Sequence, residues 1–303
     1  MIECATVKTR LRSLFILLFT LSAFSLVAAE KSKKADVSSE FVLENSYVGD
    51  TTMKMGTAGI GKVDEINNHF RYVMSRQISQ GSFLRLGLDA ERFSFGLPNG
   101  APLPNTLQST AVVIGADIEL ADSWLMRAEI SPGIYSDFKD ISGDDVDVPM
   151  IVGASYLVNE NLQWAFGISI DPRRDMPVLP GAGVRWKFAD QWTLNFILPK
   201  PRLEYEASEK LTLYAGGDIK SGSYRVDQNF GTNHGRPNLN NASVDYTEVR
   251  GGVGMSWRIC PTLRVEVEGG GMVYRQFDYH DAGFHLKNNG IAPYGQLALK
   301  ANF

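Results

Sequence analysis

Apolar residues recur at every second position along most of this sequence, from about residue 63 to its last residue. The segment LRLGLDA places Leu84, Leu86 and Leu88 on one face and Arg85 and Asp89 on the other. VVIGADIEL (112–120) and LRVEVEG (263–269) repeat this pattern. A period of two is the spacing of side chains on one face of a β-strand, whereas a helix requires a period of 3.6. The sequence therefore predicts a nearly all-β protein.

The connections between the predicted strands alternate in length. Short polar turns lie at 121–123, 159–161, 189–191, 208–210 and 260–262, and longer loops, rich in polar residues or in Gly and Pro, lie at 96–108, 137–145, 171–178, 221–244 and 278–291. The tight PKP segment (199–201) is the exception among the longer loops. Short turns at one rim and longer loops at the other are typical of a transmembrane antiparallel up-and-down β-barrel, with the short turns in the periplasm. A soluble β-sandwich has less reason to sort its loops in this way.

Thirteen strands can be placed from residue 63 onward, and a fourteenth is expected within residues 41–61 so that the strand number is even. The number falls to twelve if residues 192–207 are distorted and the N-terminal strand is absent. The predicted barrel therefore has 12–14 strands and spans residues 51–303.

All five tryptophans lie within three residues of a short turn. Trp favours the boundary between membrane and water, because its ring is apolar while its N–H stays hydrated. Trp also has a high strand propensity, but propensity alone would not collect every Trp at one rim. The sequence therefore predicts an aromatic girdle formed by Trp124, Trp164, Trp186, Trp192 and Trp257.

The N-terminal residues have the order of a secretory signal peptide. Basic residues precede an apolar run, and small residues follow at 27–29, so cleavage is predicted after Ala29. The apolar run is shorter than the ~20 residues that a membrane-spanning helix needs. Residues 30–50 are expected to form an N-terminal periplasmic segment. After cleavage 27 basic and 33 acidic residues remain, which argues against nucleic-acid binding, and Cys260 is the one cysteine left, which argues against a disulfide framework.

Many of the predicted strands carry charged residues on the face that is opposite to the apolar face. A soluble sandwich would bury the apolar face, whereas a barrel in lipid turns it outward and places the charges in the lumen. The signal peptide, the Trp positions and the short turns favour the second arrangement. The predicted lumen-facing charges are Arg85, Asp89, Asp117, Glu119, Arg127, Glu129, Arg185, Lys187, Glu204, Glu248, Arg250, Arg264 and Glu266.

The last residues, YGQLALKANF, resemble the C-terminal strand of bacterial outer-membrane β-barrels, which alternates apolar residues and ends on an aromatic one. The matching positions are Tyr294, Leu297, Leu299 and Phe303, with Ala301 smaller than usual. The resemblance implies a bacterial outer-membrane location and identifies these residues as the signal read by the outer-membrane insertion machinery. ENSYVGD (44–50), LPKPRLEYEAS (198–208) and GSYRV (222–226) are similar to an uncharacterised outer-membrane barrel family of Gram-negative bacteria, which implies no known activity.

Two functions fit such a barrel. A passive, porin-like channel would pass small polar solutes or ions through a lumen of mixed charge. A structural or receptor barrel would close its lumen with its own Arg–Glu pairs. Interleaved opposite charges on neighbouring strands would close a lumen, whereas opposed acidic and basic walls would leave it open, and the sequence does not reveal the register. A soluble secreted β-sandwich binder is the alternative outside the membrane, and the oligomeric state is left open.

The sequence offers little catalytic chemistry. His234 has Ser221, Ser223 and Ser243 in the same stretch, but no spacing singles out the triad of a membrane-embedded hydrolase. Histidines and aspartates in FDYHDAGFH (277–285) are more readily explained as solvated loop residues than as metal ligands. We therefore expect no enzyme activity, no metal site and no cofactor, and lipid as the main partner.

Overall fold

The computed structural model describes residues 37–303 and contains seventeen strand segments and four short helical segments. The strands are β1 (Val37–Met55), β2 (Ala58–Ser79), β3 (Ser82–Gly96), β4 (Thr106–Ala121), β5 (Trp124–Ile130), β6 (Gly133–Ser136), β7 (Val146–Asp147), β8 (Met150–Asn159), β9 (Leu162–Ile170), β10 (Val178–Ala189), β11 (Trp192–Phe196), β12 (Arg202–Ser208), β13 (Leu211–Arg225), β14 (Ser243–Cys260), β15 (Leu263–Tyr279), β16 (Phe284–Asn289) and β17 (Ala292–Asn302). The helical segments are Gly143–Asp145, α2 (Phe230–Asn233), Pro237–Leu239 and His280–Ala282.

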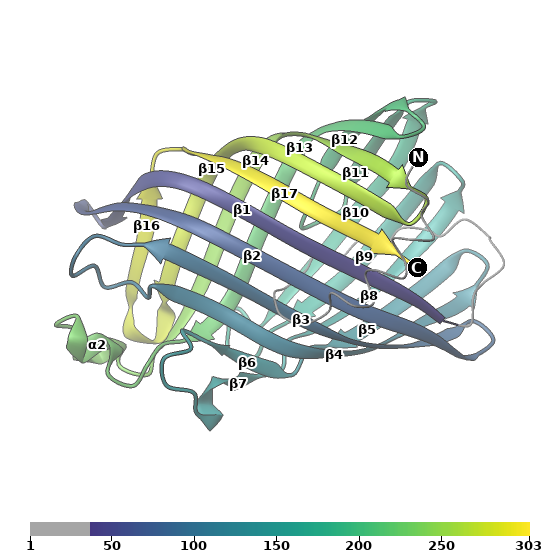
Figure 1. The fold of residues 1–303 in the computed structure, drawn as a ribbon. Coiled ribbons are helices and arrows are strands. Elements are labelled where there is room, and N and C mark those ends of the chain that lie inside the picture. Colours follow the sequence, from purple (N-terminus) through teal and green to yellow (C-terminus); the bar gives the residue numbers. More distant parts are fainter. Residues whose placement is uncertain (1–36) are drawn as a thin grey trace.

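Fourteen of these strands form a closed antiparallel barrel, in which each long strand pairs with its neighbours in the chain (Figure 1). β6, β7 and β16 are short extensions of the wall at one end. β17 closes the ring against β1 with a register that runs from Glu40 opposite Asn302 to Val48 opposite Tyr294. Closure leaves no strand edge at the seam, which is the arrangement that a hydrocarbon environment requires. The strand number agrees with the upper end of the predicted range.

The N-terminal boundary of the barrel differs from the prediction. β1 begins at Val37 and pairs with β2 and β17 on both sides, so residues 37–50 are part of the wall and not a periplasmic segment. The alternation there is weak, because Glu44 and Ser46 face the interior while Asn45 and Tyr47 face outward. The barrel therefore starts fourteen residues earlier than predicted. The predicted signal peptide lies outside the described residues.

The two rims differ as the loop lengths predict (Figure 1). The C-terminus and the two-residue turns such as 122–123 and 160–161 lie at one rim, and the longer connections with α2, β7 and β16 lie at the other. We call these the turn rim and the loop rim. No helix within residues 37–303 is long and apolar enough to cross a bilayer.

The barrel narrows toward the loop rim. β6 pairs with β4 and also, in parallel, with the end of β13, where Ser136 lies opposite Arg225 and the Asp137 N–H donates to the Arg225 carbonyl at 3.0 Å. β4 and β13 are separated by six strands of the wall, β5 and β8–β12. The contact therefore closes the interior over β8–β12 before the loop rim is reached.

Candidate functional site

The wall of the barrel carries apolar side chains outward and charges inward. In β3 the side chains of Leu84, Leu86 and Leu88 are about 40% exposed, whereas Arg85 and Asp89 are 1% and 2% exposed. This inversion follows from the period of two once the sheet closes on itself. It is the arrangement expected of a barrel in lipid.

All thirteen predicted lumen charges lie on the inward face of their strands. The burial of these charges depends on their distance from the turn rim. Those toward the middle and the loop rim are buried, whereas those at the turn rim are partly or fully exposed. The fully buried residues are Arg85, Asp89, Glu129, Glu248, Arg250 and Glu266; Asp117, Arg127, Arg185, Lys187 and Glu204 are intermediate; and Glu119 and Arg264 are exposed.

A buried network of four charged side chains crosses the interior below the loop rim. Arg250 of β14 lies 2.9 Å from Glu65 of β2, and Arg275 of β15 lies 2.8 Å from Glu65 and 2.7 Å from Glu248. Arg250 also contacts Glu248, and Tyr246 donates to both carboxylates. All four charged side chains are inaccessible to solvent. We call these four charged residues and Tyr246 the central network.

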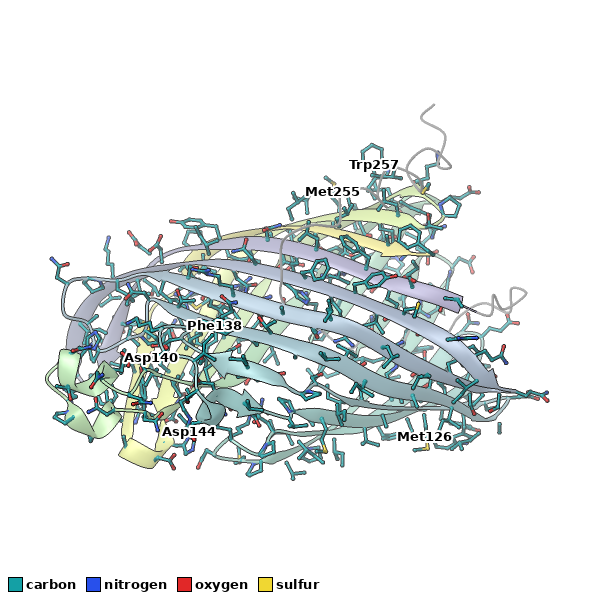
Figure 2. The ribbon with its side chains drawn as sticks, turned by 60° about the horizontal axis from the view of Figure 1, so that its bottom comes forward. Met126, Phe138, Asp140, Asp144, Met255 and Trp257 are labelled. Carbon is teal, nitrogen blue, oxygen red and sulfur yellow. The ribbon has the colours of Figure 1, made fainter. Side chains whose placement is uncertain are left out.

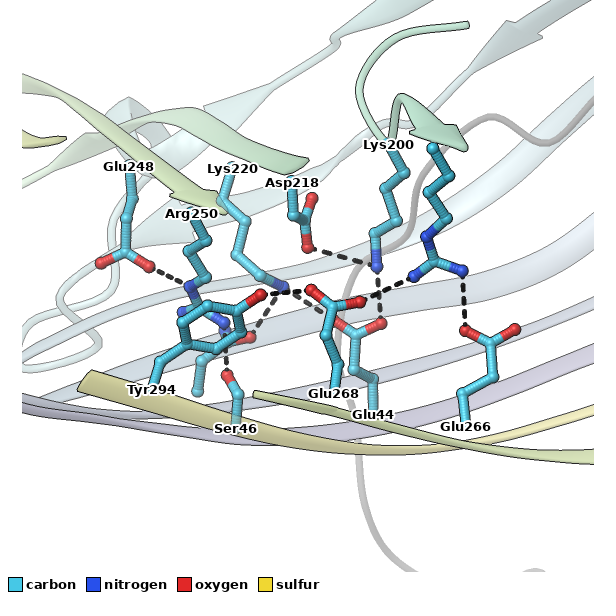
Figure 3. Close-up of polar contacts among 12 residues, drawn as sticks. Glu44, Ser46, Lys200, Asp218, Lys220, Glu248, Arg250, Glu266, Glu268 and Tyr294 are labelled. Atoms are coloured by element: carbon cyan, nitrogen blue, oxygen red, sulfur yellow. Dashed lines mark hydrogen bonds and ion pairs between the residues drawn. The ribbon is translucent and has the colours of Figure 1, made fainter. Parts of the chain in front are cut away.

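A second group of ion pairs joins β13 to the opposite wall (Figure 3). Lys220 lies 2.9 Å from Glu44 of β1, which also binds Lys200 at 2.7 Å. Lys200 comes from the connection between β11 and β12 and also lies 3.3 Å from Asp218. Because Glu44 is held by two lysines from the far side, the interior is bridged across its width at this height.

Seven further ion pairs join inward charges on nearby strands. The pairs are Arg71–Asp89 (2.6 Å), Arg71–Glu129 (2.5 Å), Arg85–Glu40 (2.9 Å), Arg127–Asp117 (2.6 Å), Arg202–Glu266 (3.1 Å), Arg202–Glu268 (3.0 Å) and Lys300–Glu266 (2.9 Å). Acidic and basic residues are therefore interleaved and not segregated into opposed walls. Of the two charge arrangements considered from the sequence, this is the one that fills a lumen.

An apolar cluster fills the barrel at the loop rim. Phe93 and Phe95 of β3 pack against Tyr246 and Phe277, with ring centroids 4.7 Å apart for Phe93–Tyr246 and 5.0 Å for Phe95–Phe277. Two loops fold inward and add fully buried side chains, Leu103 from the connection 97–105 and Phe230 and Leu239 from the connection 226–242. We call this cluster the outer plug. It lies over the central network, since Tyr246 belongs to both.

A cavity of about 420 Å³ remains beside these filled layers, on the side of β8–β13. Its floor and far wall include Glu44, His69 and Asp89 of β1–β3, and its near wall includes Phe166 of β9 and Gly181 of β10. The size is that of a small-molecule pocket. It is the candidate functional site of this barrel.

The sequence did not predict several residues of this interior. Glu44, Glu65, Arg71, Lys200, Lys220 and Arg275 carry the cross-lumen contacts but were not among the predicted lumen charges. Arg71 and Arg275 lie on strands whose alternation was recognised. Their positions in that alternation would have placed both side chains inward. Glu44 was missed because the strand expected within residues 41–61 was given no register, and residues 30–50 were assigned to a periplasmic segment.

Among the candidate catalytic and metal-binding residues, Ser223 and His280 both contact Asp245, whereas His234 bonds the backbone of its own loop. The Nδ1 atom of His234 bonds the Phe230 carbonyl at 2.7 Å, and Ser223 donates to Asp245 at 2.6 Å. His280 lies 3.6 Å from Asp245 and 3.5 Å from Asp281. Within the described part of the chain, no group of three or more His, Cys, Asp or Glu side chains is arranged to hold a metal ion.

All five tryptophans of the predicted girdle are exposed on the outward face near the turn rim, and Figure 2 shows Trp257 projecting outward, with Phe138, Asp140 and Asp144 toward the other end. Trp124 and Trp192 pack on Tyr156 and Tyr205 of neighbouring strands, with ring centroids 4.8 and 4.9 Å apart. The girdle therefore contains tyrosines as well as tryptophans.

Tryptophan fluorescence gives a direct test of the girdle. In reconstituted bilayers, phospholipids brominated close to the headgroup should quench the emission more strongly than phospholipids brominated near the chain ends, because all five rings lie at one rim. Stronger quenching by the deeper bromines would place this rim inside the hydrocarbon and contradict the assignment.

The predicted assembly residues divide between the two faces of β17. Leu297 is exposed on the outward face and Leu299 shares its side of the strand, whereas Tyr294 is buried and donates to Glu268 inside the barrel. Phe303 pairs with Ser39 through two backbone hydrogen bonds of 2.9 and 3.0 Å. Tyr294 therefore does not share a face with the other assembly residues, and its contacts belong to the interior.

Solved structures of outer-membrane proteins are similar to this barrel at low identity. The COG4313 outer membrane channel from Pseudomonas putida F1 is 10% identical, with 91% of this chain and 100% of that chain covered and a TM-score of 0.47. A Pseudomonas aeruginosa FadL homologue is 10% identical, with coverage of 88% and 89% and a TM-score of 0.39. The NanC porin is 11% identical, with coverage of 86% and 98% and a TM-score of 0.37. No residue role or solute is transferred from these proteins.

Among proteins with curated descriptions, none matches this sequence. A family model matches residues 62–288, which is three quarters of the chain and extends from β2 to β16. The chain therefore belongs to the family described as domain of unknown function DUF6268.

Proposed function

We propose that the protein is an outer-membrane channel that passes small solutes selectively and has no open pore along its axis. The observation that carries the proposal is the coexistence of filled axial layers with a cavity of about 420 Å³ beside them. The central network and the outer plug leave no continuous column for water and ions. The cavity is large enough for one small molecule.

The outer-membrane location is part of the same proposal. It is supported by the apolar outward face, the Trp positions at the turn rim and the signal-peptide pattern of the sequence. Assembly by the insertion machinery is proposed on the C-terminal residues Leu297, Leu299 and Phe303. Ser223 and His280 both contact Asp245, but the carboxylate is the shared partner and the Nδ1 atom of His280 has no hydrogen-bond partner within the described residues. Because His280 is therefore not placed to take a proton from Ser223, we propose transport and not catalysis.

A structural barrel without conductance is the second candidate, and the interleaved ion pairs favour it. The two candidates differ in whether the interior can be opened. The connection 226–242 is suited to a test, because the Val226 N–H donates to the Ala242 carbonyl at 3.0 Å and ties its two ends together. A short Gly-Ser linker could therefore replace residues 228–240 without separating β13 from β14.

In planar bilayers the wild-type protein should show no sustained current steps, because the axis is filled. The variant with residues 228–240 replaced loses Phe230 and Leu239 from the outer plug. Combined with Glu65→Ala and Arg250→Ala, which would thin the central network without changing its net charge, it should show discrete, reproducible steps. A full-length loop with Asn233→Ser and Asn238→Ser, both at exposed positions, should behave like the wild type. Large steady steps in the wild type would contradict the filled axis. A shortened variant that assembles but stays silent would favour the structural barrel.

A further inference from the structure

The wall of the barrel is interrupted above the short hairpin of β11 and β12. These strands contain five and seven residues, whereas β13 contains fifteen. β10 pairs with β11 only over residues 184–189, so residues 178–183 pair with β9 alone. Residues 220–224 of β13 pair with β14 alone, because the β12 ladder ends at Gly216. Two strand edges therefore face each other without a strand between them.

This gap is framed on every side. Its lower border is the connection 197–201, whose carbonyls at Pro199 and Pro201 accept hydrogen bonds from the N–H groups of Ile219 and Gly217 at 3.0 and 2.9 Å. Its upper border is the loop 171–177, which reaches β14 through a 3.0 Å hydrogen bond from the Asp175 N–H to Asp245. We call the opening bounded by 178–183, 220–224, 197–201 and 171–177 the side window.

The cavity reaches the side window. Its lining includes residues 179–183 on one edge of the window, residues 220–224 on the other edge and residues 197–200 on the lower border. The same cavity is lined inside by His69 and Glu44. Because no strand lies between the two edges, the window is the side on which paired backbone does not close the cavity.

The side window lies at membrane depth. Residues 178–183 are three to eight positions from Trp186 of the girdle on the same strand. At ~3.4 Å per residue and a tilt of ~40°, they lie ~8–20 Å from the girdle, within an apolar band ~25 Å tall. Unpaired strand edges are tolerated at this depth only where they line a cavity or are covered by protein. Exposed apolar side chains border the window, among them Val178, Phe196 and Leu198, and the polar Asp175 and Ser221 are exposed at its upper border and at its β13 edge.

The charges of the cavity indicate which molecules it can hold. Six acidic and four basic side chains line it, and each basic side chain already has an acidic partner. In addition, the Oε2 atom of Glu129 is buried, lies 3.6 Å from the Nε atom of Arg85 and accepts no hydrogen bond within the described residues. The interior therefore offers acceptors and no free cation to a ligand. The basic residues and their partners are Arg71–Asp89, Arg174–Asp171, Lys200–Glu44 and Lys220–Glu44.

We propose that the side window is a lateral route by which small amphipathic molecules, uncharged or cationic and able to donate a hydrogen bond, exchange between the cavity and the surrounding lipid. The proposal rests on the proposed channel function only in treating the cavity as part of a solute route. Apolar lips at the window accept the body of the molecule, and the acidic interior accepts its polar group. An anionic group would meet the surplus of carboxylates.

A cysteine inside the cavity reports on the route. A side chain at Gly181 would meet no atom within 4 Å, and its position on β10 faces inward. The control is Gly295→Cys, which lies on the outward face of β17 and also has open space around it. Both variants carry alanine in place of Cys4 and Cys260. In proteoliposomes, Gly181→Cys should react with membrane-soluble N-phenylmaleimide about as fast as this control. A sulfonated maleimide should react at least about a hundredfold more slowly with both, because a charged reagent does not enter hydrocarbon.

Closing the window should abolish this reaction selectively. Ser221→Trp at the edge of the window should slow the labelling of Gly181→Cys by about tenfold, since a large ring fills the gap. The matched substitution Val253→Trp, on the outward face of β14 away from the window, should have no effect. Decanol and decylamine should protect the cysteine from labelling, and decanoate should not.

Three results would overturn the lateral route or its assigned ligand class. Fast labelling by the sulfonated maleimide would show that the cavity opens to water and would overturn the lateral route, whatever the conductance experiment shows. Failure of both reagents at Gly181→Cys, with normal labelling at Gly295→Cys, would show a closed cavity and would also overturn it. Protection by decanoate as strong as by decylamine would overturn the assigned ligand class.

Discussion

Replacing Arg250 with methionine is expected to destabilise the barrel by about 3–5 kcal/mol. Glu65, Glu248, Arg250 and Arg275 balance two negative and two positive charges with no access to solvent. Removing Arg250 leaves Arg275 as the one arginine beside two buried carboxylates, so one negative charge is uncompensated and hydration cannot reach it. The measurement is the unfolding midpoint of the refolded barrel in urea, followed by the loss of its heat-modifiable band.

Charge balance, and not the loss of one contact, should determine the size of this effect. The double variant Arg250→Met with Glu65→Gln removes one charge of each sign and should recover most of the lost stability. Lys187→Met breaks the exposed pair with Glu206 at the turn rim and should cost less than about 1 kcal/mol. If Arg250→Met lowered the free energy of unfolding as little as Lys187→Met, the charges of the central network would be accessible to water.

Substituting proline for Asn45 is expected to prevent assembly of most of the protein. Asn45 lies in the middle of β1, opposite Leu297 of β17 on one side and Asn68 of β2 on the other. Proline removes an N–H from the ladder and leaves an unpaired carbonyl at membrane depth, which costs several kcal/mol. The measurement is the fraction of heat-modifiable, protease-resistant barrel recovered from the outer membrane.

The matched variant Asn45→Val keeps the backbone donor and suits an outward position in lipid, so it should assemble like the wild type. Normal assembly of Asn45→Pro would contradict a seam that uses residues 37–50, and would restore the boundary expected at residue 51. The pair of variants therefore tests the correction to the N-terminal boundary of the barrel.

Much of the wall could be predicted because successive side chains of a β-strand point to opposite faces of the sheet. Arg85 lies between Leu84 and Leu86 in the sequence, and that spacing alone places the arginine and the leucines on opposite faces. The turn lengths and the positions of Trp124 and Trp257 then identified the rim. These signals are local, and they survive without knowledge of the rest of the fold.

The cross-lumen partners could not be predicted, because they depend on the closure and stagger of the whole barrel. Glu65 and Arg250 are 185 positions apart, and which strands face each other across the lumen is not encoded in either segment. The outer plug was missed for a different reason. PNGAPLPN (98–105) has the composition of a solvated turn, but Leu103 is fully buried because the loop folds into the mouth of the barrel. The side window likewise results from unequal strand lengths around the ring.

The parallel contact between β6 and β13 divides the molecule into two parts with different tolerance to change. Every residue of the outer plug comes from β1–β4, β6, β13–β16 or the connections between them, and none comes from β8–β12. The β8–β12 hairpins can therefore lengthen, shorten or exchange side chains without disturbing the packed part that holds the barrel shut. Sequence variation among members of the family should concentrate in these hairpins and spare the outer plug. The solute selectivity of the proposed channel could then change while the outer plug stays the same.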